Sequence, residues 1–389
     1  MMDLFYTEEE NKFRMNLGRF LKAELEPIAE EVENKDEVPF EFLKKLGAEG
    51  YMGMLHPKEF GGTAKGLIGN HIVSEEICYY SPATDISRAV STVYFAVPVN
   101  HWGTPEQKRK YLPPVIKGLE FGALAITEPR GGSDAAGMQT NAARKGDVYI
   151  LNGEKTWISN SSFASFICVF AITNHDVHPH QGMSALIVEQ GTPGFKLIRN
   201  LRSMGVLGSS HSHIKFEDCK VPKANILGKE NEGWAILMDE LQSERIDIAS
   251  RGLGCARRAF EEAVKYSANR EQFGRKIRKF EAISFKIADM KVALDAARLL
   301  IVRAARMYDQ GLSIEKEGAI AKLFASEASF KIADQALQVH GASGYSKDSI
   351  IERLFRDTRV YGFGGGTSEI MRFLIQREVY KEFGFEQKK

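Results

Sequence analysis

The stretch "GWAILMDELQSERIDIASRGLGCARRAFEEAVKYSANR", residues 233–270, decides the fold. Its apolar residues recur at the 3.6-residue period of an α-helix, and no proline interrupts them. Residues 281–311 and 313–341 show the same apolar stripe. Long amphipathic helices joined by short loops favour an antiparallel bundle, because each helix buries its stripe against its neighbours. We therefore expect residues 232–389 to form a C-terminal four-helix bundle domain.

Before this bundle, the pattern of residue types changes near residue 123. Residues 123–231 contain short runs of Val, Ile and aromatic residues between turn residues, which predicts a β domain of about six to eight strands. Residues 1–122 read as helical, and Thr7 and Glu10 have the spacing of a capping box. The expected fold is mainly α: an N-terminal α-helical domain (1–122), a central β-barrel domain (123–231) and the bundle (232–389).

Composition limits the class of protein. The 389 residues carry a net charge of +1 without a block of like charge, which argues against nucleic-acid binding. No apolar run reaches transmembrane length, and the acidic N-terminus lacks the features of a signal or transit peptide. We expect a soluble, cytoplasmic protein without membrane insertion.

Cysteine and histidine patterns do not predict a metal site. Cys78, Cys168, Cys219 and Cys255 lack metal-binding or redox spacing, so reduced and mostly buried thiols are expected. The histidines of "HDVHPHQG", residues 175–182, lie in a stretch with Pro and Gly that favours an exposed loop over a metal centre.

Several stretches could bind a ligand. "AITEPRGGSD", residues 125–134, groups hydroxyls with backbone amides, which suits an anion or a heterocycle edge but also a plain turn. Trp157 lies in an expected strand, where core packing is the more usual role. Arg270 could hold a phosphate or could end a solvated helix. "RVYGFGGGTSEIMR", residues 359–372, predicts a glycine loop that enters a helix, whose first N–H groups can bind an anion.

Taken together, the order and spacing of these motifs resemble the acyl-CoA dehydrogenase family over essentially the whole chain. The motifs that carry the resemblance are "PKEFGG" (57–62), "GTPEQKRKYLPP" (103–114), "ITEPRGGSD" (126–134), "LNGEKTWISN" (151–160), "FEDCKVP" (216–222), "REQFG" (270–274), "QVHGASGYSKD" (338–348) and "GGTSEIMR" (365–372).

The resemblance implies a homotetrameric flavoprotein with FAD between the β domain and the bundle. Such enzymes take a proton from Cα and a hydride from Cβ of an acyl-CoA thioester, deliver the hydride to flavin N5, and usually pass electrons to an electron-transfer flavoprotein. Arg270 and residues 338–342 would contact the FAD of a second subunit. Glu281 stands where the family usually has Gln, which departs from one such contact.

Site residues follow from the same resemblance. The implied FAD contacts are Ile126, Thr127, Ser133, Trp157, Ile158, Ser159, Arg270, Glu281, Gln338, Val339, His340, Gly341, Ala342, Thr367, Ser368 and Glu369. The implied substrate contacts are Ser133, Gln242, Ser243, Arg245, Gly365 and Gly366.

The reaction needs a desolvated carboxylate as base. Many family members place a Glu where this chain has Gly365, directly after the usual aromatic position, which is Gly364 here. The isovaleryl and long-chain branches place the base on the first bundle helix instead, in a pattern that "LQSERIDIA" (241–249) matches at Glu244. Glu244 is therefore the predicted base, with a solvated, ion-paired carboxylate as the alternative. The small loop predicts a branched, cyclic or otherwise bulky acyl group.

Other interpretations stay open. Asp85 or Arg88 could serve a cyclic or dicarboxylic acyl-CoA of the cyclohexane- or cyclohexenecarboxyl, benzylsuccinyl or glutaryl type, although an exposed helix face is the favoured expectation for both residues. An acyl-CoA oxidase would be expected to have an added C-terminal domain. A flavin-containing nucleic-acid-binding relative would need a basic patch, which 52 basic and 51 acidic residues do not indicate.

Overall fold

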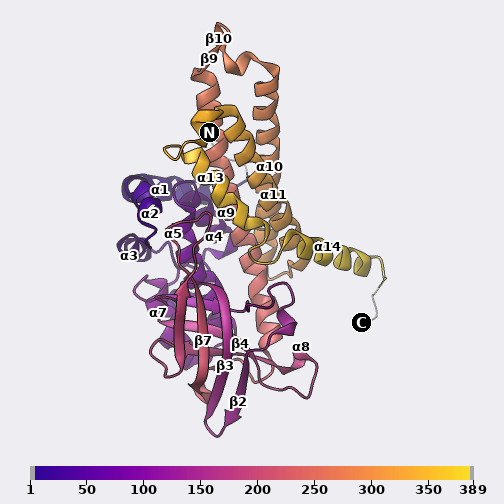
Figure 1. The fold of residues 1–389 in the computed structure, drawn as a ribbon. Helices are drawn as coiled ribbons and strands as arrows, with labels where there is room; N and C mark the ends of the chain where they lie inside the picture. The colour runs from indigo at the N-terminus through magenta and orange to yellow at the C-terminus, as the bar shows by residue number, and fades with distance from the viewer. Residues whose placement is uncertain (1–4, 386–389) are drawn as a thin grey trace.

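The computed structural model describes residues 5–385. A sheet domain lies between two helical parts in the sequence, and Figure 1 shows it at one end of the molecule with the long bundle helices rising from it. This arrangement confirms the expected fold class and the order helix, sheet, helix. The exact domain boundaries stay a prediction, although the first strand begins at Gly122 and the first bundle helix at Gly233.

Most of the N-terminal helices lie beside the bundle, whereas α7 lies beside the sheet (Figure 1). They are α1 (Glu8–Glu24), α2 (Ala29–Lys35), α3 (Phe40–Ala48), α4 (Gly66–Cys78), α5 (Pro82–Ala89), α6 (Ala96–Trp102) and α7 (Pro105–Ile116). The predicted capping box is present, because Thr7 N donates to Glu10 Oε2 at 2.8 Å and Glu10 N donates to Thr7 Oγ1 at 3.3 Å. A π-helical turn, Val90–Phe95, joins α5 to α6.

The central sheet has eight strands in the order β6-β7-β3-β2-β4-β5-β8, with β1 beside β4. Its strands are β1 (Gly122–Ala125), β2 (Asn141–Lys145), β3 (Val148–Ser159), β4 (Phe166–Ile172), β5 (Met183–Glu189), β6 (Phe195–Asn200), β7 (His211–Pro222) and β8 (Ile226–Leu227). A one-turn helix, α8 (Pro179–Gly182), precedes β5. The ladder between β3 and β7 shifts register between Lys155 and Ile158, which releases the intervening residues from regular pairing.

The C-terminal part is built around α9 (Gly233–Asn269), which packs on α4, α10 and α11 and also reaches β5. The other helices are α10 (Glu281–Asp309), α11 (Glu315–His340), α12 (Ala342–Tyr345), α13 (Ile350–Thr358) and α14 (Ser368–Glu382). A short hairpin, β9 (Glu271–Gln272) with β10 (Arg275–Lys276), lies at the tip of the bundle, and α14 projects from the body (Figure 1). Because α9 touches both helical parts and the sheet, its side chains are placed where the domains meet.

The four cysteines are buried free thiols, as expected. Within residues 5–385, no helix is long and apolar enough to cross a membrane. No three His, Cys, Asp or Glu side chains in this described part gather closely enough to hold a metal ion. His180 instead stacks on Trp234, with ring centroids 3.8 Å apart.

Candidate active site

Glu244 and the glycine loop meet in space, although 120 residues of sequence separate them. Glu244 lies on α9 and is 7% exposed. A Cβ built on Gly365 would lie 2.9 Å from Glu244 Oε1 and 2.3 Å from Ile248 Cδ1. Gly365 also has φ of +61°, a conformation that glycine adopts most easily. The carboxylate therefore occupies the space that a side chain at position 365 would need.

The glycine loop is fixed from two sides. Lys322, fully buried on α11, donates from Nζ to the Gly366 carbonyl oxygen. Burial lowers the pKa of Lys322 to about 8. After the loop, Thr367 Oγ1 accepts from Ile370 N at 3.2 Å and caps α14. The loop is thus anchored next to Glu244, and the N-terminal turn of α14 begins beside it.

The electrostatic surroundings make Glu244 a stronger base than an exposed glutamate. Burial raises its pKa, while a hydrogen bond with Glu240 and the positive charges of Arg251 and Arg245 oppose this rise. The net pKa is raised. Because a desolvated carboxylate holds a proton more tightly, this position suits abstraction of a weakly acidic C–H proton.

Asp85 and Arg88 are both 0% exposed, so the expectation that they lie on a solvated helix face is wrong. Arg88 Nε donates to Asp85 Oδ1 at 2.6 Å, and Arg88 Nη2 lies 3.3 Å from Asp247 Oδ1. α5 is covered by α4 and α9, and α9 supplies Asp247 and Arg251 as charged partners. Arg251 also donates to the hydroxyl of Tyr94, which lies in the π-helical turn. These charges form a buried network between α5 and α9.

A second group of predicted residues gathers at the start of the sheet. Thr156 N donates to Thr127 O at 2.9 Å, which joins the segment 126–133 to the segment 157–159. The buried Lys155 strengthens this junction, because its Nζ donates to Ile126 O at 2.8 Å and to Glu128 Oε1 at 2.9 Å. Ser133 is exposed at the end of the first segment.

Trp157 is 54% exposed, which excludes the alternative of core packing, while its implied contact with FAD stays a prediction. Its φ of +59° and the register shift of β3 direct it out of the regular ladder. Ile158 is buried behind it, and Ser159 Oγ lies 2.9 Å from His211 Nδ1. Burial lowers the pKa of His211 to about 4, which keeps the ring neutral. An exposed indole beside hydroxyl and backbone donors fits a planar heterocycle such as a flavin ring.

Other predicted cofactor contacts lie at the far tip of the bundle. Arg270 is exposed and leads into the β9–β10 hairpin (Figure 1), while the ring of His340 lies 4.3 Å from that of Tyr266 near the end of α9. α11 ends at His340, and Gly341 follows with φ of +59°. Gln338, Gly341 and Ala342 are exposed, Val339 is buried, and Glu281 is exposed at the start of α10. Since α9 rises about 1.5 Å per residue, this tip lies about 39 Å from Glu244.

The predicted substrate contacts on α9 have partners within the protein. Gln242 Oε1 accepts from Ile314 N at 3.0 Å, next to the start of α11. Ser243 Oγ donates to Glu240 O at 3.0 Å, and Arg245 is buried. Their contact with a substrate stays a prediction. The sequence analysis did not single out Glu240, although a second Glu four residues before Glu244 was a visible signal.

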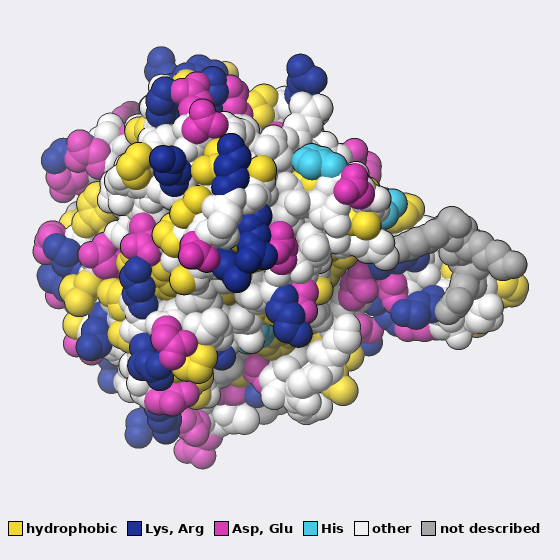
Figure 2. Space-filling view, turned by 90° about the horizontal axis from the view of Figure 1, so that it is seen from below, with side chains coloured by type: hydrophobic (Ala, Val, Ile, Leu, Met, Phe, Trp, Pro, Cys, Tyr) yellow, Lys and Arg dark blue, Asp and Glu magenta, His cyan; other side chains and the backbone are white. Residues whose placement is uncertain are grey.

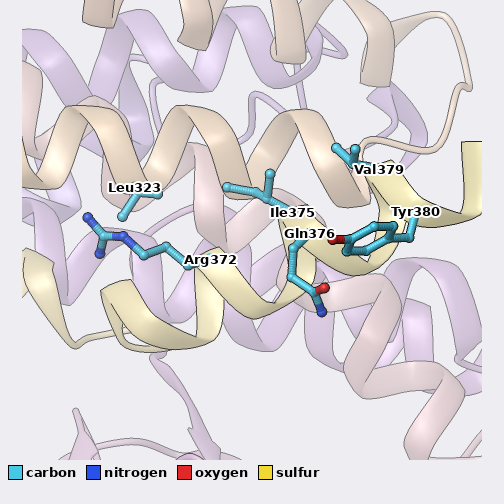
Figure 3. Close-up of a pocket in the computed structure, with 6 residues that line it drawn as sticks. All are labelled: Leu323, Arg372, Ile375, Gln376, Val379 and Tyr380. Carbon is cyan, nitrogen blue, oxygen red and sulfur yellow. The ribbon is translucent and has the colours of Figure 1, made fainter. Parts of the chain in front are cut away.

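The surface shows a further hollow between α11 and α14. Figure 3 shows its lining residues, Leu323, Arg372, Ile375, Gln376, Val379 and Tyr380. They include none of the predicted site residues, and Arg372 pairs with Glu327 at 2.7 Å. On the face seen in Figure 2, basic and acidic side chains are interspersed, and no basic patch gathers there.

Three family models match successive parts of the chain. Their descriptions are acyl-CoA dehydrogenase, N-terminal domain (residues 7–119), middle domain (residues 123–219) and C-terminal domain (residues 231–380). A probable acyl-CoA dehydrogenase, YngJ, of Bacillus subtilis (strain 168) is 40% identical over 98% of this chain and 100% of its own length. A short-chain specific acyl-CoA dehydrogenase of Clostridium acetobutylicum is 37% identical over 98% of this chain and 100% of its own.

Solved structures agree with these matches. Butyryl-CoA dehydrogenase from Megasphaera elsdenii superimposes with a TM-score of 0.93 at 34% identity, covering 97% of this chain and 100% of that chain. A chain from a structure of the electron transferring flavoprotein of Acidaminococcus fermentans gives 0.94 at 38% identity, covering 97% and 99%. A structure described as an FAD complex of PigA gives 0.93 at 28% identity, covering 99% and 100%.

Proposed function

The chain belongs to the acyl-CoA dehydrogenase family, and we propose that it is an FAD-dependent dehydrogenase of an acyl-CoA thioester with Glu244 as its catalytic base. The family comprises oxidoreductases that act on CH–CH donors. The observation that supports Glu244 is its buried carboxylate, whose Oε1 lies against the glycine loop where other family members have a glutamate.

Different residues of this chain have different roles in the proposed reaction. Glu244 takes the proton from Cα, because burial raises the pKa of its carboxyl and makes it a stronger base. Lys322 donates a hydrogen bond to the Gly366 carbonyl oxygen and so holds the loop next to the base. FAD would be held by residues 126–127, 133, 157–159 and 367–369. FAD, when bound, supplies the acceptor for the hydride from Cβ.

We further propose a branched, cyclic or otherwise bulky acyl group. Gly365 gives no extra room, because Glu244 and Ile248 fill the space beside it. The room lies at Gly364, where a Cβ would meet only Val360 O, at 3.4 Å. An aromatic side chain is usual at that position in the family, so its absence leaves space next to the reacting carbons.

The partners follow from family membership. An acyl-CoA is the substrate class, an electron-transfer flavoprotein is the proposed electron acceptor, and a homotetramer is the proposed assembly. In such an assembly Arg270, Glu281 and residues 338–342 would reach the FAD of a neighbouring subunit, which accounts for their exposure at the bundle tip. The buried ion pairs of Arg88 occupy its donor groups, so they offer no support for a dicarboxylic substrate.

The test is anaerobic bleaching of the flavin band by a panel of acyl-CoA thioesters, with wild type and Glu244→Gln compared at equal flavin content. The panel contains isovaleryl, octanoyl, glutaryl, cyclohexanecarbonyl, cyclohexenecarbonyl and benzylsuccinyl thioesters. We expect a branched or cyclic member to bleach wild type and not the variant. Bleaching that persists in the variant would place the base elsewhere, and a preference for butyryl-CoA in a control reaction would contradict the bulky acyl group.

A further inference from the structure

A second buried carboxyl lies one helical turn before Glu244. Glu240 is 0% exposed on α9, and residues four apart on a helix face the same side. Its carboxyl interacts with that of Glu244, and this interaction, together with burial, raises the pKa of Glu240. Neither oxygen of Glu240 receives a hydrogen bond from any donor group in residues 5–385. A buried carboxylate without donors is a costly arrangement, so this group needs another source of stabilisation.

A proton supplies that stabilisation. Two ionised carboxylates are both acceptors and cannot hydrogen-bond to each other, whereas a carboxylic acid donates to a carboxylate. Two carboxyl groups in one buried site also avoid ionising together, because their like charges repel. A hydrogen bond between Glu240 and Glu244 would therefore require one proton between them.

We infer that Glu240 is a positioning residue that holds this proton and donates it in a hydrogen bond to the Glu244 carboxylate, so that the pair carries a single negative charge. This inference rests on the proposed role of Glu244 as base. With Oε1 of Glu244 against the glycine loop, the bond from Glu240 fixes the carboxylate from the side of the preceding helical turn. The pair then titrates as a unit.

The surroundings favour the proton on Glu240. Burial and then the charge of Glu244 raise the pKa of Glu240 well above its usual value. The positive charge of Arg251 acts on Glu244 and keeps the negative charge there. Other titratable and charged groups also act on one or both carboxyls. They lie on α9 itself, in the π-helical turn, and on β4, α10 and α11. They are Asp239 (which pairs with His101 of α6), Arg245, Asp247, Arg251, Tyr94, Cys168, Tyr308 and Lys322.

The first test uses the direction of a pH shift. In Glu240→Met the hydrogen bond to Glu244 is lost, so the acid limb of kcat/KM should move upward by about one to two pH units, the size of a hydrogen bond to a charged group. Glu240→Gln retains an N–H donor and should return the limb close to that of wild type. Glu262→Met, on the same helix, is the matched control. A downward shift of the acid limb in Glu240→Met would mean that an ionised Glu240 had been removed. An acid limb at the same pH as in wild type would mean that Glu240 only fills space. Either result overturns the inference.

The second test needs no substrate. In the infrared difference spectrum of flavin-loaded wild type minus Glu240→Gln at neutral pH, we expect the C=O stretch of a protonated carboxylic acid, shifted by D2O. In Glu244→Gln this band should titrate at lower pH, because the negative partner is gone. A missing band, or a band unaffected by Glu244→Gln, overturns the shared proton. If Glu244→Gln still bleaches, the proposed base is wrong, while the band continues to report on the pair.

Discussion

Replacing Gly365 with alanine should lower the catalytic rate strongly and the stability of the fold only moderately, because the new Cβ displaces the proposed base. The new Cβ would lie 2.3 Å from Ile248 Cδ1 and 2.9 Å from Glu244 Oε1, both at the ends of rotatable side chains. Rotating such ends away costs roughly 1 kcal/mol, and a non-glycine residue at φ of +61° costs about 1–2 kcal/mol more. We therefore expect a loss of about 2–3 kcal/mol of stability, measured as a lowered Tm.

The effect on catalysis should be larger, because the atoms that move include the proposed base. A displacement of about 1 Å at a reacting group can cost about 100-fold in rate. The assay is kcat/KM from flavin bleaching with the best thioester of the panel. Ile248→Val removes Cδ1 and should restore part of the activity in the double variant, while the contact with Oε1 remains.

Gly364→Ala is the matched control, because its Cβ would meet only Val360 O at 3.4 Å. It should leave Tm and the rate with a small substrate nearly unchanged. The reasoning fails if Gly365→Ala and Gly364→Ala have the same kcat/KM, or if Gly365→Ala loses stability without losing activity. Either outcome would mean that the carboxylate does not work from the position next to the loop.

Three further predictions concern other parts of the structure. Burial raises the pKa of Asp357 to about 7 from 3.8, so the native state keeps a proton that the unfolded state releases. The free energy of unfolding should therefore fall as pH rises from about 4 to 7, and Asp357→Asn should flatten this pH dependence in Tm measurements. Lys155→Met leaves Glu128 buried without its ion pair, which should cost about 3–5 kcal/mol and lower FAD content, with Glu128→Gln restoring part of both. Trp157→Ala should change the stability of the flavin-free protein by less than about 1 kcal/mol but weaken FAD retention, measured by equilibrium dialysis.

Local patterns in the sequence predicted local structure well. The capping box at Thr7 and the end of α11 before Gly341 are where backbone chemistry requires them, and each depends on residues within one or two turns. The long apolar stripe of 233–270 became a single helix, α9, because its periodicity is never broken by proline. These features need no knowledge of distant partners.

The failures share a different cause. The charge of Asp85 and Arg88 suggested solvent, but their partners Asp247 and Arg251 come from a helix about 160 residues later in the chain. A local pattern contains no information about such a pairing. For Trp157 the strand pattern left core packing open as the usual alternative to the implied FAD contact, and the register shift in β3 that exposes the side chain arises from pairing with β7. Glu240 was overlooked because a helical Glu is normally solvated, and only the packed structure shows its burial.

The position of the carboxylate and the glycine loop depend on each other. A base on α9 is held by a helix that packs against α4, α10 and α11, which limits its motion more than a loop does. Oε1 of Glu244 lies in the space that a Cβ at position 365 would need, so glycine is favoured there. Lys322 anchors this loop through the Gly366 carbonyl oxygen. Glu240 adds the remaining constraint, because a carboxylate on a helix can still rotate about its side-chain bonds, and a hydrogen bond from the preceding turn removes that freedom. Under the proposed assignment of Glu244 as the base, the glycine loop, Lys322 and Glu240 together hold that carboxylate in place.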